Sequence, residues 1–260
     1  MLNFGVPGYG TDQALLRIEK QYDRIRSPTV LLCVLTENIN RCVSVYGGFY
    51  RQGWWGTKPR FVLRDGRLEL YNPFSTPDEV RDILLYHPER LIAIGREHDY
   101  WYQKLELFGR PWHIGFPYSL ELCARVPYCL ERLKVGLTDV DSYVPLYREG
   151  SEALEIMKGI MQRFRGFADK RHFKGLVVIF PRIRDARRLA KTGEIGYQAL
   201  PDFLTTEGIP YIDLVDVIVQ QPDIATLYVH GNEHLTRAGG EVVVPEILDF
   251  LRRNDALPGP

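Results

Sequence analysis

The 260-residue amino-acid sequence predicts an α/β fold with a mostly parallel sheet. Residues 29–35 and 175–181 are apolar runs of strand length, and each follows a segment whose apolar residues recur at helical spacing. Neither run alternates with polar residues, which is typical of strands buried on both faces of a parallel sheet. A short strand predicted over 209–214 completes the alternation of strands and helices.

The first of these units occupies the start of the chain. Residues 2–13 contain three glycines and a proline, and they predict a strand end that turns into a helix capped by Thr11 or Asp12. Helical spacing of apolar residues predicts that helix over 14–25, and the strand over 29–35 follows it.

The second unit lies in the last part of the chain. Periodicity and turn residues predict, in order, a helix over 152–167, the strand over 175–181, a helix over 197–206 that stops near Gly208, the strand over 209–214 and a closing helix over 245–252. Alternation of this kind indicates layers of helices on a sheet.

Residues 41–148 differ from both ends, because they are rich in Tyr, Trp, Pro and Gly. Within them, residues 61–70 predict a hairpin with an Asp65-Gly66 turn. We interpret this aromatic-rich stretch as an insertion in a single domain that covers 1–260. Two roles remain open for it: shaping a pocket or lid above the sheet, and plain structural filling.

Composition excludes several classes of protein. With 45% apolar and 25% charged residues, the chain is neither disordered nor collagen-like. Its 33 basic residues balance 33 acidic ones, so no nucleic-acid partner is expected. No apolar run reaches the roughly 20 residues of a membrane span, and no secretory signal is evident. We expect a soluble chain, cytoplasmic by default, whose compartment and oligomeric state the sequence leaves unknown.

The cysteines favour neither a disulfide scaffold nor a zinc ribbon, because no two of them form a CxxC pair. Buried apolar thiols are expected instead. The cysteines are Cys33, Cys42, Cys123 and Cys129.

Polar residues follow the first predicted strand, over 36–41, and a loop over 228–239 carries two histidines. Ligands of open α/β sheets bind outside the carboxyl ends of the strands, which is where the first of these segments must lie and where we expect the second.

Three short segments resemble blocks of the SGNH (GDSL-type) hydrolases. Residues 3–13 (NFGVPGYGTDQ) resemble the second block, Glu37-Asn38 resembles the third, and residues 234–239 (HLTRAG) resemble the last. Their order and spacing agree over nearly the whole chain. The resemblance implies a flavodoxin-like three-layer α/β/α fold and a hydrolase acting on a small-molecule ester or an acylated sugar.

The resemblance also implies roles for single residues. Gly8 would donate its backbone N–H, and Asn38 its side-chain amide, to the oxyanion of an ester under attack. His234 would be the general base, because a histidine both accepts and returns a proton near neutral pH. No cofactor and no metal are implied.

The chain departs from the family in its nucleophile and its acid. The Gly-Asp-Ser block is absent, as are the family's first strand, first helix and most of its second strand, so we expect a truncated chain lacking its N-terminal strand or strands. No internal serine has the required glycine turn (Ser27, Ser44, Ser75, Ser119, Ser142 and Ser151). Asn232 stands near the place of the usual aspartate, where its amide could orient His234 without supplying charge.

Simpler interpretations stay open for each of these residues. Gly8 could be only a turn glycine with positive φ, Asn38 only a cap, and His234 only a surface histidine. His230 is interpreted as structural. The whole chain could be a non-catalytic α/β module for binding or assembly, with a degenerate hydrolase site.

Two further sites are disfavoured. A metal site from His230, Glu233 and His234 fits no strong ligand spacing. Nucleotide binding through residues 5–10 is disfavoured because they are not GxGxxG and Pro7 lacks a backbone donor. The aromatic residues of 49–55 suit stacking on a sugar ring or an acyl chain, and packing within the insertion explains them equally well.

Overall fold

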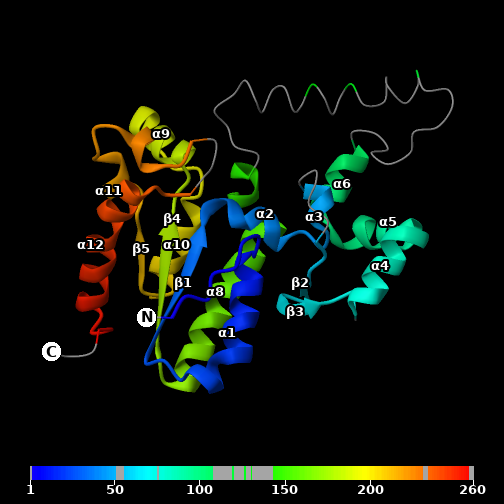
Figure 1. Cartoon of the computed structure of the whole chain (residues 1–260), viewed down its shortest axis with the longest axis horizontal. Helices are drawn as coiled ribbons and strands as arrows, with labels where there is room; N and C mark the ends of the chain where they lie inside the picture. The colour runs from blue at the N-terminus through cyan, green and yellow to red at the C-terminus, as the bar shows by residue number, and fades with distance from the viewer. Residues whose placement is uncertain are drawn as a thin grey trace. The chain divides into compact units, whose positions relative to one another are not determined.

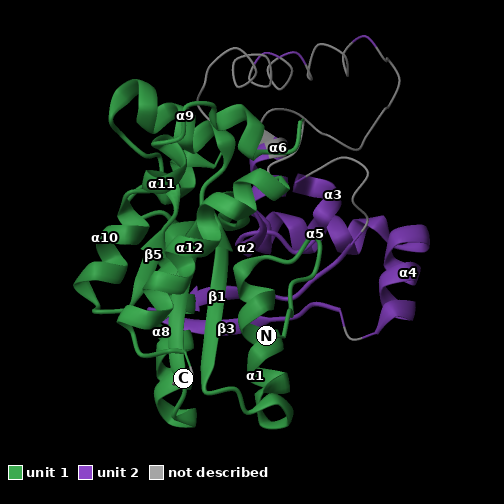
Figure 2. Ribbon diagram, turned by 60° about the vertical axis from the view of Figure 1, so that its left-hand side comes forward, with its two compact units in different colours: residues 1–39, 143–260 green, residues 40–142 purple. Residues whose placement is uncertain are grey.

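The computed structural model describes residues 2–50, 56–74, 76–107, 143–230 and 234–257, together with Ser119, Val126 and Leu130. The chain divides into two compact units (Figure 2). The first unit combines residues 1–39 with 143–260, and the second consists of residues 40–142. The second unit falls largely within the stretch that the sequence marks as an insertion.

The first unit is built on a parallel three-stranded sheet (Figure 1). Its strands are β1 (Thr29–Leu35), β4 (Lys174–Phe180) and β5 (Tyr211–Asp213), in the order β1-β4-β5. Strands β1 and β4 pair along their full length, from Thr29 beside Lys174 to Leu35 beside Phe180. The predicted α/β class with a mostly parallel sheet is confirmed.

Helices α1 (Thr11–Ile25) and α8 (Glu152–Arg171) pack against β1 and β4, respectively, and against each other. Helix α8 approaches the sheet closely because Gly175 has no side chain. A Cβ atom there would lie only 2.9 Å from the Cβ atom of Ala168.

Even-numbered residues of β4 lie on the face of the sheet opposite to Gly175 and pack against other helices. There Val178 is fully buried with residues of α9 (Ile183–Thr192), α11 (Val215–Val219) and α12 (Arg237–Arg253). A smaller cluster joins Leu176 to Phe250 and Leu251 of α12. Strand β4 is therefore buried on both faces, as its uninterrupted apolar sequence predicts.

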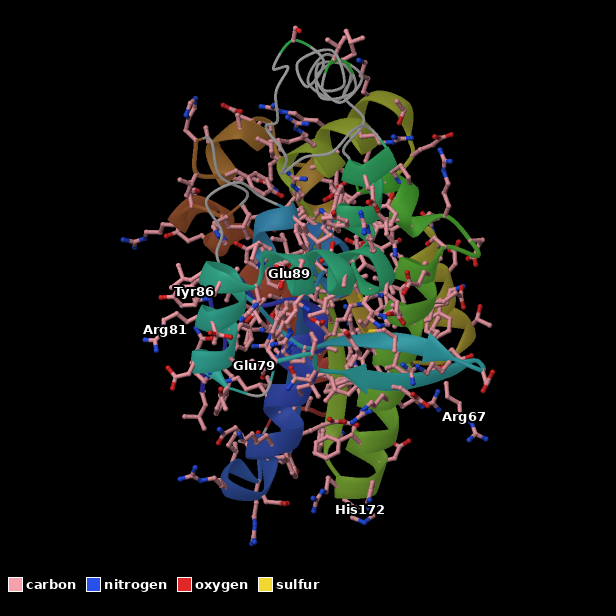
Figure 3. The ribbon with its side chains drawn as sticks, turned by 90° about the vertical axis from the view of Figure 1, so that its right-hand side faces the viewer. Arg67, Glu79, Arg81, Tyr86, Glu89 and His172 are labelled. Carbon is pink, nitrogen blue, oxygen red and sulfur yellow. The ribbon has the colours of Figure 1, made fainter. Side chains whose placement is uncertain are left out.

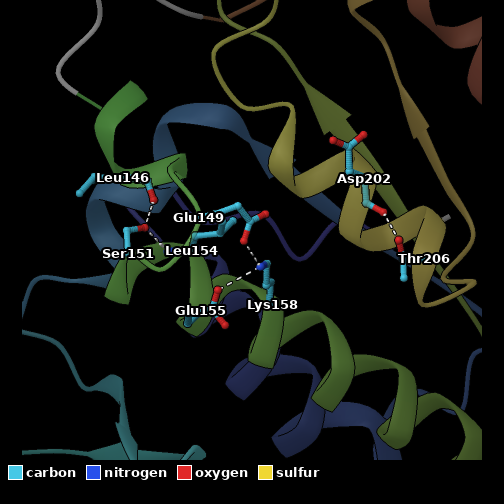
Figure 4. A network of polar contacts seen from close by, with 8 residues as sticks. All are labelled: Leu146, Glu149, Ser151, Leu154, Glu155, Lys158, Asp202 and Thr206. Carbon is cyan, nitrogen blue, oxygen red and sulfur yellow. Dashed lines mark hydrogen bonds and ion pairs between the residues drawn. The ribbon is translucent and has the colours of Figure 1, made fainter.

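A polar network fixes the start of α8 (Figure 4). The Ser151 hydroxyl accepts from the Leu154 N–H at 3.2 Å and donates to the Leu146 carbonyl at 2.5 Å. Leu146 belongs to the 3-10 helix η2 (Val144–Tyr147), so the cap joins η2 to α8. Lys158 reaches Glu149 at 2.7 Å and Glu155 at 3.0 Å on the same end of the helix.

The second unit holds short helices and one hairpin. Its elements are α3 (Gly47–Tyr50), β2 (Arg60–Arg64), β3 (Arg67–Tyr71), α4 (Pro77–Tyr86), α5 (Pro88–His98) and α6 (Tyr100–Leu107), and α2 (Ile39–Cys42) leads into it. The hairpin prediction is confirmed: Asp65 and Gly66 both have positive φ, 49° and 71°, as a type I′ turn requires. Tyr86 projects outward from α4 (Figure 3).

A buried carboxylate organises the second unit. Asp99 accepts from the Ser44 hydroxyl at 2.8 Å, from the Val45 N–H at 2.7 Å, and from the first N–H groups of α6. Burial raises the pKa of the Asp99 carboxyl group, although these hydrogen bonds act in the opposite direction. The serine is thereby held inside the unit.

Several predicted boundaries were wrong. Residues 2–6 form no strand, and α1 begins at Thr11 because Gly10 is its N-cap, with its N–H donating to the Gln13 side chain at 3.2 Å. Thr11 and Asp12 thus lie inside the first turn. Helix α12 begins at Arg237, capped by Thr236, and Pro245 lies within it. The predicted start of the closing helix at Pro245 is therefore wrong.

The edge of the sheet at β1 differs most from the expectation of a fully buried strand. Cys33, expected as a buried thiol, is exposed in the middle of β1, whereas Cys42 is buried. Cys123 and Cys129 lie outside the described residues. Among the strands that the structure describes, β4 is the only neighbour of β1, so one edge of β1 has no strand beside it.

Candidate functional site

The carboxyl ends of the three parallel strands lie at one edge of the sheet in the first unit. Strand β1 ends at Leu35, and the 3-10 helix η1 (Thr36–Asn38) follows it. Strand β4 ends before Pro181-Arg182, and β5 ends at Asp213. This edge is where open α/β sheets hold their ligands.

Asp185, in the first turn of α9, ties two of these strand ends together. Its carboxylate accepts from the Thr36 hydroxyl at 2.6 Å and from the Arg182 N–H at 2.9 Å. The Tyr143 hydroxyl donates to its other oxygen. Asp185 is only 3% exposed, and this burial raises its pKa although the three donors act in the opposite direction.

The same contacts hold η1 in place. The Thr36 side chain is bound by Asp185, and the Thr36 carbonyl accepts from the Tyr147 hydroxyl at 2.8 Å. Asn38 lies two residues later, on a turn that is held through both the side chain and the backbone carbonyl of Thr36.

Asp213 is the second carboxyl group at this edge. Its Oδ1 accepts from the Tyr197 hydroxyl at 3.1 Å and from the Val215 N–H at 3.0 Å. Burial, with a smaller effect from the charges of Asp216 and Asp185, raises its pKa to about 7. Burial also raises the pKa of Tyr197 well above its usual range.

These groups form one cluster, which we name the carboxyl-edge network, because the Tyr147 and Tyr197 rings, with centres 6.0 Å apart, join the two sets of hydrogen bonds. Its members are Thr36, Tyr143, Tyr147, Asp185, Tyr197 and Asp213. The Arg182 guanidinium lies 5.4 Å from the centre of the Tyr143 ring, which adds a positive charge beside the network. A carboxyl group with a pKa near 7 exchanges its proton at neutral pH, which is what general acid–base chemistry needs.

The three residues singled out by the motifs all belong to the first unit. Gly8 lies in a type II turn, in which the Tyr9 N–H donates to the Val6 carbonyl at 3.2 Å. Pro7 supplies the second position of the turn, and Gly8 has φ +86°. The positive φ therefore explains the glycine as a turn residue, whatever else its N–H does.

Asn38 ends η1 at the carboxyl end of β1. Its Oδ1 atom is buried, and within the described part of the chain it has no hydrogen-bond partner. An unsatisfied buried amide oxygen costs roughly 1–3 kcal/mol, and a ligand that donates to it would remove that cost. Among the described residues, the Asn38 side chain has no hydrogen-bond partner that would identify it as a cap of η1 or α2.

His234 lies at the same edge through a chain of backbone contacts. Its carbonyl accepts from the Val229 N–H at 2.9 Å, beside the bridge between Tyr228 and Leu235. The Tyr228 hydroxyl donates to the Pro181 carbonyl at 2.9 Å, which anchors this loop to the end of β4.

The imidazole of His234 is exposed, and in the described residues it contacts neither Asn38 nor the carboxyl-edge network through a hydrogen bond. His230 is exposed as well. Asn232, the possible orienter of His234, lies outside the described residues.

The described serines have structural places. Ser27 binds the Thr29 carbonyl at 2.6 Å, Ser44 is buried against Asp99, and Ser151 caps α8. Ser119 is exposed, and Ser75 and Ser142 lie outside the described residues. Of the serines that the structure describes, none lies on a turn from a sheet strand into a helix.

The described residues show neither a metal cluster nor a membrane-spanning helix. Among the residues described, no three His, Cys, Asp or Glu side chains gather closely enough to hold a metal ion. Glu233, a member of the disfavoured triad, lies outside that part of the chain. Of the helices described, none has both the length and the apolar character to cross a bilayer.

Sequence reasoning missed Asp185 and Asp213. The sequence held a signal for both, because Asp213 lies near the end of the strand predicted over 209–214, and Asp185 lies shortly after the strand predicted over 175–181. Both carboxyl groups lie at or shortly after the carboxyl ends of parallel strands, as residues 36–41 do, which is where ligands of open α/β sheets bind. Their tyrosine partners, distant in sequence, carried no such signal.

No family model matches this chain, and neither a curated protein nor a solved structure matches it.

Proposed function

We propose that this chain is an SGNH-type α/β module that binds a carboxylic ester, such as an acylated sugar, at the carboxyl edge of its sheet. The proposed fold is the family's flavodoxin-like three-layer arrangement. The observation that supports the proposal most is that Asn38 and the loop of His234 lie at one edge of one sheet. Two motifs far apart in sequence thus share a position where ligands bind.

Each residue has a stated role in this proposal. The Asn38 amide and the Gly8 N–H donate to the ester oxygen as negative charge develops on it, and His234 takes the proton from the attacking hydroxyl. Loss of a single oxyanion donor typically lowers turnover by about 10²–10³. The carboxyl-edge network positions Asn38 through Thr36 and touches no reacting atom.

Hydrolysis also needs a serine nucleophile, and the free edge of β1 is where a strand presenting one would pair. The Lys174 N–H donates to the Pro28 carbonyl at 2.9 Å. The backbone N–H and C=O groups of even-numbered residues in β1 therefore point toward β4, and those of odd-numbered residues point away from it. At Thr29, the Ser27 hydroxyl donates to the outward carbonyl and accepts from the outward N–H. Within the described residues, the outward N–H and C=O groups of Leu31 and Cys33 have no partner, whereas the Leu35 carbonyl caps the start of η1.

The structural places of the described serines favour a second candidate function, a non-catalytic module that binds the ester without cleaving it. In that case Asn38 and Gly8 would still contact the ligand, and His234 would have no proton to move. The two functions share the binding site and differ only in the nucleophile.

A fluorophosphonate probe separates them. Protein purified from its native host is incubated with the probe, and a hydrolase is expected to become labelled on one serine, with labelling lost in His234→Ala and kept in His230→Ala. Equal loss in both variants would contradict the role of His234.

An unlabelled protein whose Asn38 amide resonance shifts with a non-hydrolysable phosphonate ester supports the binding module instead. If neither labelling nor the Asn38 shift occurs, the proposal is wrong.

A further inference from the structure

Helix α12 has an outward face that nothing in the proposed function uses. Its inward face buries Gly239, Val243 and Phe250 against the sheet side of the first unit. On the outward face, Val244 is 50% exposed and Leu248 is 37% exposed. The two residues are one helical turn apart and therefore form an apolar stripe along the solvent side of the helix.

Charged pairs lie at both ends of this stripe. At the amino end, Arg237 and Glu241 are paired at 2.9 Å. At the carboxyl end, Asp249 and Arg252 are paired at 2.5 Å, and Asp255 follows with a side chain that is 94% exposed and 3.9 Å from the Lys174 ammonium. All five side chains are well exposed, so their charges face solvent together with the apolar stripe.

Four of these five charges, those of Arg237, Glu241, Arg252 and Asp255, match their own reverse with opposite sign, whereas Asp249 falls opposite Val244. Two copies of α12 packed antiparallel about a two-fold axis between residues 246 and 247 would place Glu241 opposite Arg252 of the second copy. The same axis brings Arg237 near Asp255 of the second copy, and Pro245 opposite Leu248. A parallel arrangement would instead place each charge opposite its own kind.

We propose that the outward face of α12 binds a second copy of this chain in this antiparallel arrangement. The interface is isologous, so each favourable contact occurs twice. Its centre is apolar, from Val244, Pro245 and Leu248, and its two ends hold the paired charges. Facing helices of this kind lie 8–10 Å apart, which leaves room for interlocking Val and Leu side chains.

The chain segments at the two ends of α12 extend the apolar surface. Val229, in the loop anchored before α12, is 43% exposed, and Leu257, just after α12, is 37% exposed. An antiparallel pair brings the amino end of one helix to the carboxyl end of the other, so these two residues would approach each other across the dimer. Figure 1 shows α12 covering one side of the sheet of the first unit.

Charge-reversal variants test the proposal by sedimentation velocity over a concentration series. Glu241→Arg and Arg252→Glu, each alone, oppose like charges twice and should weaken the dimer about tenfold. An equimolar mixture of the two variants should associate like the original chain, because both cross-helix pairs are restored in the heterodimer. Repulsion within either helix is unchanged by mixing, so it cannot explain such a recovery.

Leu248→Lys tests the apolar centre, and Leu85→Lys is its matched control. Leu85 is 62% exposed on α4, so both changes place a lysine on an exposed helical site. Only Leu248→Lys should shift the chain to monomer, with the far-ultraviolet circular dichroism of both variants unchanged. A chain that is monomeric at every concentration overturns the proposal, and so does a dimer that Glu241→Arg and Leu248→Lys leave intact.

Discussion

Replacing Asp213 by asparagine should make the stability of the first unit less dependent on pH. Asparagine keeps an oxygen that accepts from the Tyr197 hydroxyl and the Val215 N–H, so the geometry at the end of β5 is retained. It removes the one carboxyl group of the carboxyl-edge network whose pKa is about 7. The difference in unfolding free energy between variant and wild type therefore isolates the titration of Asp213.

The direction and size follow from the pKa values. The folded pKa of Asp213 lies above the value of about 3.9 expected in the unfolded chain, so its stabilising contribution is complete below pH 3.9 and is lost as pH rises through 7. A difference of about three pKa units corresponds to about 4 kcal/mol, of which about 3 kcal/mol falls between pH 5 and pH 8. Asp213→Asn should thus become more stable relative to wild type by about 3 kcal/mol over that interval.

Urea unfolding followed by far-ultraviolet circular dichroism at several pH values measures this difference. All four tryptophans fall within residues 40–142, so their fluorescence reports the second unit and serves as an internal reference. Asp216→Asn is the matched control, because Asp216 is an exposed neighbour of Asp213. A flat difference for Asp213→Asn, or the same slope for Asp216→Asn, would refute the reasoning.

Three further predictions concern the same unit. Asp185→Leu should destabilise it by about 3 kcal/mol in urea unfolding, because the buried Thr36 hydroxyl, Tyr143 hydroxyl and Arg182 N–H lose their acceptor; a loss below 1 kcal/mol would show that the network relaxes without it. Amide hydrogens of Leu31 and Cys33 should exchange faster than those of Leu32 and Val34, as measured by NMR, because only the latter face β4; equal protection would place a partner on the free edge of β1. Gly8→Ala should cost about 1 kcal/mol at its φ of +86°, whereas Gly166→Ala in exposed α8 should stabilise by about 1 kcal/mol; the opposite order of unfolding midpoints would contradict the turn assignment.

Local patterns in the sequence were enough to locate the strands and the hairpin. The uninterrupted apolar run at 175–181 predicts β4, which is shifted by one residue and is buried on both faces. Asp65-Gly66 predicts its hairpin because few residue pairs tolerate two consecutive positive φ angles. Helix starts were less accurate, since Gly10 caps α1 through its backbone and Pro245 lies inside α12, where sequence signals suggest other boundaries.

Half of the candidate site could be anticipated in the same way. Asn38 follows a strand directly, and strand ends of a parallel sheet share one edge, so its position there was a matter of topology. Asp185 and Asp213 could have been included by the same rule. Their tyrosine partners could not, because Tyr143 is 42 residues from Asp185 and reaches it only through the folded backbone.

The sequence by itself determined the class of the fold, the order along the chain of the three sheet strands and of helices α1, α8, α10 (Ala199–Thr206) and α12, and the turn that carries Gly8, because each depends on side-chain periodicity or backbone conformation over a few residues. Only the tertiary structure decided which carboxyl groups are buried, and therefore that the pKa of Asp213 lies near 7. It also decided that Cys33 is exposed at a sheet edge and that the outward face of α12 is open to solvent. Burial and pKa depend on neighbours that are distant along the chain, so no local pattern can specify them.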